Sequence, residues 1–145
     1  MKIIDLLNSE HGVFLTELEV LKRMLDSKVT TKELKAVVRT IAKAVAKHRL
    51  VEERTIYRQF KRKFGKNFPL IKTMEREHEK IEWCLKHIES GRENTREIVQ
   101  TFIRVLEEHI QKEITIVFPM IKKELAPESL EYEFFSPKCA KTTPS

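Results

Sequence analysis

The sequence has few of the residues that interrupt helices or staple small folds. Its 145 residues include three glycines, five prolines and two cysteines. Because glycine and proline disfavour helix interiors, their scarcity, together with 34% charged residues, favours long solvent-facing helices over sheet. A chain of this length makes one domain and can bury a core without disulfides.

Long hydrophobic runs are also missing. No apolar stretch approaches 18 residues, so no membrane partner is predicted. The apolar stretch in residues 1–7 is short and interrupted by Asp5, and it lacks the longer apolar run and cleavage site of a signal peptide. Cys84 and Cys139 share no metal-type spacing and are interpreted as reduced thiols, although one bridge between them stays open. These absences indicate a cytoplasmic protein.

Positive charge is in modest excess, at +6. Its densest cluster comprises Arg58, Lys61, Arg62, Lys63 and Lys66. Such a cluster either contacts nucleic acid or complements the negative end of a helix. We favour the helix-end interpretation and predict no nucleic-acid partner.

Four segments carry apolar residues at helical spacing. The expected helices span about residues 3–26, 31–64, 69–90 and 95–126. Four helices joined by short links predict an all-α fold, an antiparallel up-and-down four-helix bundle. We expect residues 1–126 to form this bundle.

The predicted helix ends have their own signals. Thr30 and Glu33 have the spacing of a capping box, and Gly91 is a C-terminal signal. Asn94 or Thr95 can cap the fourth helix. Pro119 should kink or loosen the last turns of that helix.

Residues 127–145 are expected to form a short, partly disordered C-terminal tail. The tail contains an aromatic cluster at residues 131–135. This cluster either folds onto the open end of the bundle or contacts a protein partner, including a second copy of the chain.

Four of the five histidines lie on the core-facing stripes, one per helix: His11, His48, His78 and His109. A single histidine on an apolar face is more often a hydrogen-bonded core residue than a metal ligand. Four such placements, one on each helix, favour a shared role. His87 lies off the stripe of its helix and is interpreted as a surface residue.

Two of these histidines begin a His-x-x-x-Glu pattern, which adds Glu52 and Glu113 to the set. Residues four apart on a helix face the same way, about 6 Å apart along the axis. An imidazole and a carboxylate so placed can reach one shared ion. A carboxylate directed into an apolar core is costly unless a cation neutralises it.

The two halves of the chain repeat this layout. Glu10-His11 opens one half and Glu77-His78 opens the other. Each half therefore forms a helical hairpin that supplies a histidine, then a histidine and a glutamate, and two hairpins can hold two ions. About 16 residues follow His48 but only about nine precede His78 in their helices, so we expect the second helix to bend or unravel at residues 58–63.

Imidazole and carboxylate donors without cysteine suit iron, manganese or zinc. Each ion would receive two imidazoles and share two bridging carboxylates, which leaves positions for an oxo or hydroxo bridge or a small ligand. We predict two iron ions, with manganese or zinc less favoured. A metal-free helical interaction module is the remaining alternative.

These motifs resemble the hemerythrin-like, or HHE cation-binding, family over nearly the whole chain up to Pro127. The residues that carry the resemblance are Glu10-His11, His48-x-x-x-Glu52-Glu53, Glu77-His78, His109-x-x-x-Glu113 and Phe118-Pro119. The resemblance implies a non-haem di-iron site that meets oxygen, nitric oxide or peroxide. It also implies that the four histidines are terminal ligands and that Glu52 and Glu113 bridge.

The chain departs from the oxygen-carrying hemerythrins at two places. They have a further histidine four residues after the third-helix histidine, where this chain has Glu82. Their last carboxylate is an aspartate five residues after the histidine, whereas Glu113 lies four after His109. Glu82 either ligates an iron or is a surface residue. A carboxylate-rich site favours redox reaction over reversible oxygen carriage.

The ligand set is closer to that of iron-centre repair proteins, which respond to nitrosative and oxidative stress. Those proteins carry a further cysteine-bearing domain, which this sequence does not show. The expected function is binding, sensing or redox reaction of a small oxidant, and the alternative is an enzyme that repairs iron–sulfur centres or reduces peroxide or nitric oxide.

Three further residues lie close to the predicted ligands in the sequence. Glu53 and Glu77 stand beside the histidines and could accept an imidazole N–H, with a solvated helix edge favoured for Glu53. Tyr57 either lines the site or belongs to the core, and we favour the core.

Overall fold

The computed structural model describes residues 2–91 and 94–131. Its α-helices are α1 (Ile3–Leu25), α2 (Thr31–Arg54), α3 (Ile56–Phe64), α4 (Pro69–Ser90), α5 (Thr95–Lys112) and α6 (Phe118–Glu124). A π-helix, η1 (Glu113–Val117), joins α5 to α6, and a 3₁₀-helix, η2 (Pro127–Leu130), follows α6. Nothing in the described part of the chain forms a sheet. No described helix is long and apolar enough to cross a membrane.

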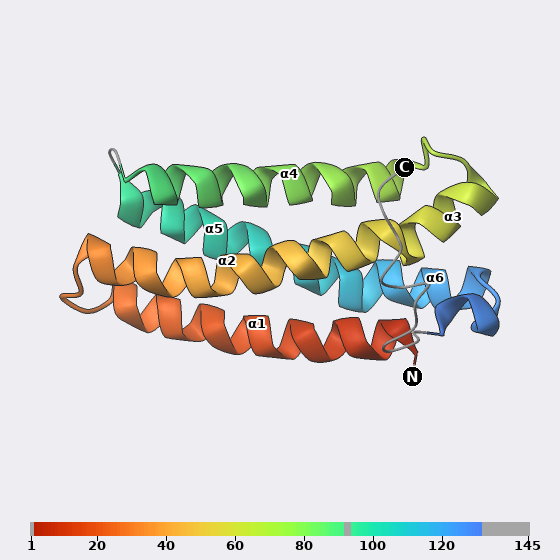
Figure 1. Cartoon of the computed structure of the whole chain (residues 1–145), viewed down its shortest axis with the longest axis horizontal. Coiled ribbons are helices and arrows are strands. Elements are labelled where there is room, and N and C mark those ends of the chain that lie inside the picture. The colour runs from red at the N-terminus through yellow and green to blue at the C-terminus, as the bar shows by residue number, and fades with distance from the viewer. Residues whose placement is uncertain (1, 92–93, 132–145) are drawn as a thin grey trace.

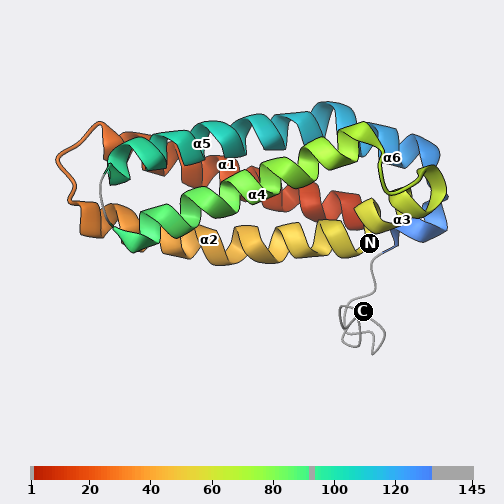
Figure 2. The same cartoon turned by 90° about the horizontal axis from the view of Figure 1, so that it is seen from above.

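The four long helices lie side by side as a bundle (Figures 1 and 2). Helix α1 packs against α2, α2 against α4, α4 against α5, and α5 against α1, so that the helices form a closed ring around one core. This arrangement confirms the predicted all-α four-helix bundle. The predicted boundary at residue 126 stays a prediction, although η2 continues to pack beyond it.

Local signals position the ends of the helices. Thr30 accepts the backbone N–H of Glu33 through its side chain while the Glu33 carboxylate accepts the backbone N–H of Thr30, which confirms the capping box. Gly91 ends α4 with φ +61°, a left-handed conformation that favours glycine. Asn94 precedes α5 as expected, but its side chain makes no capping hydrogen bond.

The prediction that the second helix bends at residues 58–63 is wrong. The break lies earlier, at Thr55 (φ −116°, ψ −90°), and residues 58–63 are helical within α3. The Thr55 hydroxyl donates to the carbonyl of Val51, a side-chain bond that bends helices. The surplus length after His48 therefore forms a separate helix, α3 (Figure 1). Its buried residues are Ile56, Tyr57 and Phe60.

The expected irregularity near Pro119 is confirmed in a specific form. Phe118 donates its backbone N–H to the carbonyl of Glu113, five residues back, and this bond closes the π-helix η1. Pro119, the next residue, has no N–H to donate. A π-turn is an uncommon insertion that often marks a functional site.

The core consists of two apolar clusters, one on each side of the histidines. On α1 the first cluster includes Phe14 and Leu18, and the second includes Ile4 and Leu7. His11 lies between them. Leu130 of η2 joins the second cluster. Of the predicted aromatic segment 131–135, only Glu131 is described, where it pairs with Lys2; residues 132–135 lie outside the described residues.

Two smaller predictions concern surface and thiol residues. Lys61, Arg62 and Lys63 lie in the last turn of α3, as the helix-end interpretation requires. Lys61 also pairs with Glu75 at 2.5 Å. Cys84 is a free, buried thiol, whereas Cys139 lies outside the described residues.

Candidate metal centre

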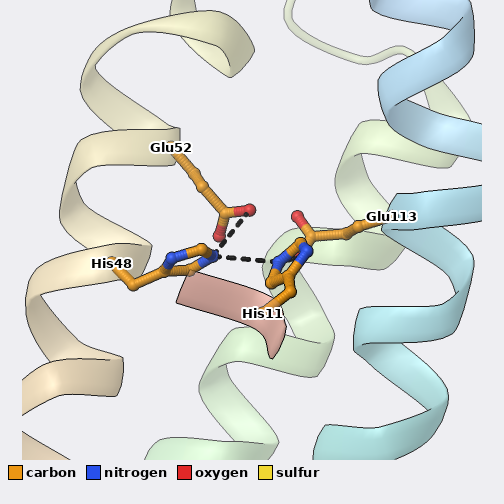
Figure 3. Close-up of side chains that lie close together, drawn as sticks. All are labelled: His11, His48, Glu52 and Glu113. Atoms are coloured by element: carbon orange, nitrogen blue, oxygen red, sulfur yellow. Dashed lines mark hydrogen bonds and ion pairs between the residues drawn. The ribbon is translucent and has the colours of Figure 1, made fainter. Parts of the chain in front are cut away.

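The structure brings the six predicted side chains together in the middle of the bundle. None is more than 5% exposed: His11, His48, Glu52, His78, His109 and Glu113. They come from α1, α2, α4, α5 and the first residue of η1, and all six line one small internal cavity. In Figure 3 the carboxylates of Glu52 and Glu113 extend toward each other from opposite sides, with the imidazoles of His11 and His48 beside them.

The six side chains form two overlapping groups that could each hold a metal ion. His11 and His48 belong to one group and His78 and His109 to the other, while Glu52 and Glu113 belong to both. Within each group the potential donor atoms lie within 4.8 Å of one another. Two carboxylates shared between two histidine pairs are the arrangement that a pair of bridged ions requires.

The donor separations suit coordination. His48 Nε2 and Glu52 Oε2 are 3.3 Å apart, as are His78 Nε2 and the other Glu52 oxygen. His11 and His109 place Nε2 at 3.1 and 3.2 Å from Glu113 Oε1. Two atoms that each lie about 2.1 Å from one ion are roughly 3 Å apart at ordinary coordination angles. The residues present therefore fit a metal pair without large movement.

Three carboxylates just outside the six donors, which we call the outer carboxylates, determine which nitrogen of three imidazoles faces the site. His48 donates its Nδ1–H to Glu10 at 3.0 Å. In the same way His78 donates to Glu53 at 3.0 Å, and His109 donates to Glu77 at 2.9 Å. With the proton on Nδ1, the Nε2 atom of a neutral imidazole presents a lone pair to the cavity. Each outer carboxylate also increases the basicity of that nitrogen.

Several inward-facing atoms have no protein partner that suits them. His11 Nε2 and His48 Nε2 are 3.1 Å apart, a separation at which two lone pairs repel unless a proton or cation lies between them. Both oxygens of Glu52 and the Nε2 atom of His109 are buried without a hydrogen bond of good geometry. Orphaned acceptors in an apolar core are costly. A cation among them would remove that cost.

The two shared carboxylates differ in acidity. Burial, and then the charge of Glu113, raise the pKa of Glu52 well above its usual value. Burial acts on Glu113 in the same direction, but close polar contacts with Glu52, His109 and His11 hold its pKa well below the usual value. Without a cation, the pair therefore keeps a proton on Glu52 while Glu113 stays ionised.

The imidazoles also differ. Burial lowers the pKa of His11. Burial opposes protonation of His109 as well, but the close contact with Glu113 and the hydrogen bond to Glu77 raise the pKa to about 10. Without metal, the imidazole of His11 is therefore neutral at pH 7, whereas that of His109 is protonated.

Two residues that the sequence assigned to other environments contact the site. Tyr57, interpreted as plain core, donates its hydroxyl to Glu113 Oε2 and stacks on the His78 ring at 5.9 Å between centroids. Burial and the charges of Glu52 and Glu113 raise the pKa of Tyr57 well above its usual value, so the phenol keeps its proton. Glu53, interpreted as a solvated edge, is the acceptor for His78. Tyr57 is therefore a core residue, as favoured, that also lines the site, whereas the interpretation favoured for Glu53 is wrong.

Four other residues near the predicted ligands differ in their contact with the site. Glu77 accepts from His109, one of the two roles considered for it. Glu82 belongs to neither metal group; its side chain is 46% exposed and pairs with Arg49 at 2.7 Å, so the surface interpretation holds. His87 is outside the site, stacked on Trp83. The role of Glu10 was not predicted, although its repeat with Glu77 before a histidine was the available signal.

A surface pocket of about 220 Å³ between α2 and α4 leads toward the site. His78, Ile81 and Arg49 line both this pocket and the internal cavity. The Arg49 guanidinium donates to Glu53 at 3.3 Å and to Glu82 at 2.7 Å, and so links α2 to α4 where the two spaces meet. Arg49, together with His78 and Ile81, therefore lies between the pocket and the internal cavity.

Comparison with known protein families gives a match over most of the chain. The family model described as the hemerythrin HHE cation binding domain matches residues 2–121. Neither the curated proteins nor the solved structures include a significant match. The matched segment contains all six side chains of the site and the outer carboxylates that support them. The chain belongs to the hemerythrin HHE cation-binding domain family.

Proposed function

We propose that this protein is a non-haem di-iron protein that binds oxygen, nitric oxide or hydrogen peroxide in the bundle core and reacts with it. One observation carries the proposal: two histidine pairs share the buried carboxylates Glu52 and Glu113. In this proposal His11 and His48 would hold one ion, His78 and His109 would hold the other, and both glutamates would bridge.

The donor chemistry supports iron. The site offers imidazole nitrogen and carboxylate oxygen without thiolate, a set that suits iron, manganese or zinc. Two bound iron ions would supply one-electron redox chemistry and open coordination positions for a small ligand. Three outer carboxylates and two bridging ones increase the negative charge around the site, which stabilises oxidised metal and so supports reaction over reversible carriage.

The protein side chains prepare the site before any ligand arrives. Glu10, Glu53 and Glu77 keep the proton of their imidazoles on Nδ1, so that Nε2 faces inward. Tyr57 holds one oxygen of Glu113. The apolar clusters on both sides exclude water, which strengthens each electrostatic contact within the site.

The pocket between α2 and α4 supports a route for small molecules. His78 lines both this pocket and the internal cavity. Arg49, paired with Glu53 and Glu82, would have to move for a molecule to pass. Because these two carboxylates already neutralise Arg49, the opening attracts anions weakly and suits neutral oxygen, nitric oxide or hydrogen peroxide.

The metal-free alternative explains the structure less well. A helical interaction module would need no carboxylate such as Glu52, which is fully buried without a hydrogen-bond partner for either oxygen.

We also propose that the protein acts in the cytoplasm and takes part in a stress response. The free thiol of Cys84 supports the location, because thiols stay reduced in that compartment.

Metal content tests the function directly. Protein expressed with iron available should contain two iron ions per chain and show near-ultraviolet absorption after exposure to air. His109→Ala should lose iron and this absorption, because it removes a donor from the site. His87→Ala is the control, since the His87 imidazole on α4 lies outside the site, stacked on Trp83. Wild-type protein without iron, or equal iron in His109→Ala, would refute the proposal.

A further inference from the structure

Around the ring of four helices, an outer carboxylate on one helix supports a site histidine on the next helix in three of the four steps. Glu10 of α1 supports His48 of α2, Glu53 of α2 supports His78 of α4, and Glu77 of α4 supports His109 of α5. The fourth step would lead from α5 or η1 back to His11. There the Nδ1 atom of His11 is buried without a hydrogen-bond partner among the described residues.

The missing support falls on one side of the site only. His78 and His109, which share one metal group, each donate to a carboxylate. That carboxylate is in turn held by a cation, Arg49 on Glu53 and Lys112 on Glu77. In the other group only His48 has an outer carboxylate at Nδ1, and His11 packs its ring on Phe118 at 5.3 Å between centroids instead. The two groups therefore offer the same donor atoms with unequal support.

The sequence repeat shows where the asymmetry originates. Glu53 directly follows the shared carboxylate Glu52 in the first hairpin. The residue that directly follows Glu113 in the second hairpin is Ile114, which cannot accept a hydrogen bond. It is 36% exposed and lies in the π-helix η1. An isoleucine therefore occupies the place from which an acid would complete the ring.

We infer that the two metal positions are unequal: the position of His78 and His109 binds its ion more tightly and fills first, while the ion at His11 and His48 is the exchangeable one. The inference rests on the proposed two-metal function. An imidazole whose Nδ1–H is accepted by a carboxylate is a stronger donor, and loss of one such partner weakens metal binding about 10- to 100-fold. An unpaired buried N–H adds to the cost at His11.

Anaerobic titration of metal-free protein with ferrous iron tests this order. Wild type should bind two ions with dissociation constants that differ by about 10- to 100-fold. His11→Ala should keep the tighter ion and lose the weaker, whereas His78→Ala should lose the tighter. Circular dichroism checks that both variants remain helical. Two equal positions, or the reverse assignment, would overturn the inference while leaving the di-iron function intact; no binding at all would refute the function itself.

Two conservative variants test the cause without removing a donor. Glu53→Gln keeps size but removes the charge beside His78, and should weaken the tighter position so that the two constants approach each other. Glu82→Gln is the matched control, because Glu82 binds the same arginine and touches no imidazole. Ile114→Glu should tighten the weaker position. Equal effects of Glu53→Gln and Glu82→Gln would contradict a role for the outer carboxylate.

Discussion

At the scale of single residues, identical side chains acquire different properties from their partners. Glu52 and Glu113 are both fully buried and both shared between the metal groups. Glu113 has Tyr57 and His11 as hydrogen-bond partners, whereas neither oxygen of Glu52 has one. Their pKa values therefore shift in opposite directions. The chemistry of each carboxylate is determined by its contacts and not by its residue type.

Tyr57→Phe tests the support of Glu113 at this scale. The substitution keeps the ring on His78 and removes only the hydroxyl that donates to a buried, ionised carboxylate. We expect the free energy of unfolding of the metal-free protein to fall by about 1.5–3 kcal/mol, since hydrogen bonds to charged groups contribute that much. Urea denaturation measures the loss. A transition midpoint equal to that of wild type would show that the hydroxyl does not stabilise the site.

At the scale of helices, the pair α2 and α4 controls the surroundings of His78. Helix α2 contributes Arg49 and Glu53 from one edge, and α4 contributes Glu82 from the facing edge. The three charges form the outer wall of the pocket beside the site. A second ion pair, Arg39 with Glu89, joins the same two helices away from the pocket. Comparing variants of the two pairs therefore distinguishes an effect on the pocket from a general effect of linking α2 to α4.

Arg49→Ala should open the route to the site. We expect the bimolecular reaction of the iron-loaded protein with hydrogen peroxide to become several-fold faster, because the side chain between pocket and cavity is gone. Stopped-flow absorbance measures the rate. Arg39→Ala removes an ion pair between the same helices and should react like wild type. Equal rates for the two variants would place the route elsewhere.

At the scale of the whole molecule, the site connects all four long helices. The six side chains come from both hairpins, so metal bound among them would join the two halves of the chain. Because unfolding separates those donors, an ion that binds the folded state stabilises it, by about 2.7 kcal/mol when present at 100 times its dissociation constant.

Removal of the metal should therefore lower the thermal stability of the bundle. We expect the metal-free protein to retain its helix content but to melt at a lower temperature than iron-loaded protein, and to recover when iron is restored. Circular dichroism melting of both forms measures the change. The same melting temperature for two samples of different iron content would contradict a site that bridges the helices.

Much of the fold and the site could be predicted from the sequence because both depend on helical periodicity. His48 and Glu52 face one way on any regular helix, and short links force hairpins to place His11 near the level of His48. The break at Thr55 could not be predicted in place. It depends on how Tyr57 and Phe60 pack once the other helices are present, and residue counts alone indicate only that surplus length exists.

The sequence by itself determined the helices, their inward stripes and the six polar residues on them, because these follow from interactions within a few residues along the chain. The tertiary structure decided which carboxylate each imidazole meets, that Glu82 turns to Arg49, and that the Nδ1 atom of His11, unlike those of the other three site histidines, has no carboxylate. A residue at the edge of a helix can contact several partners on neighbouring helices. Which partner it contacts depends on the distances between helices, and these are set by packing. Local patterns do not encode those distances.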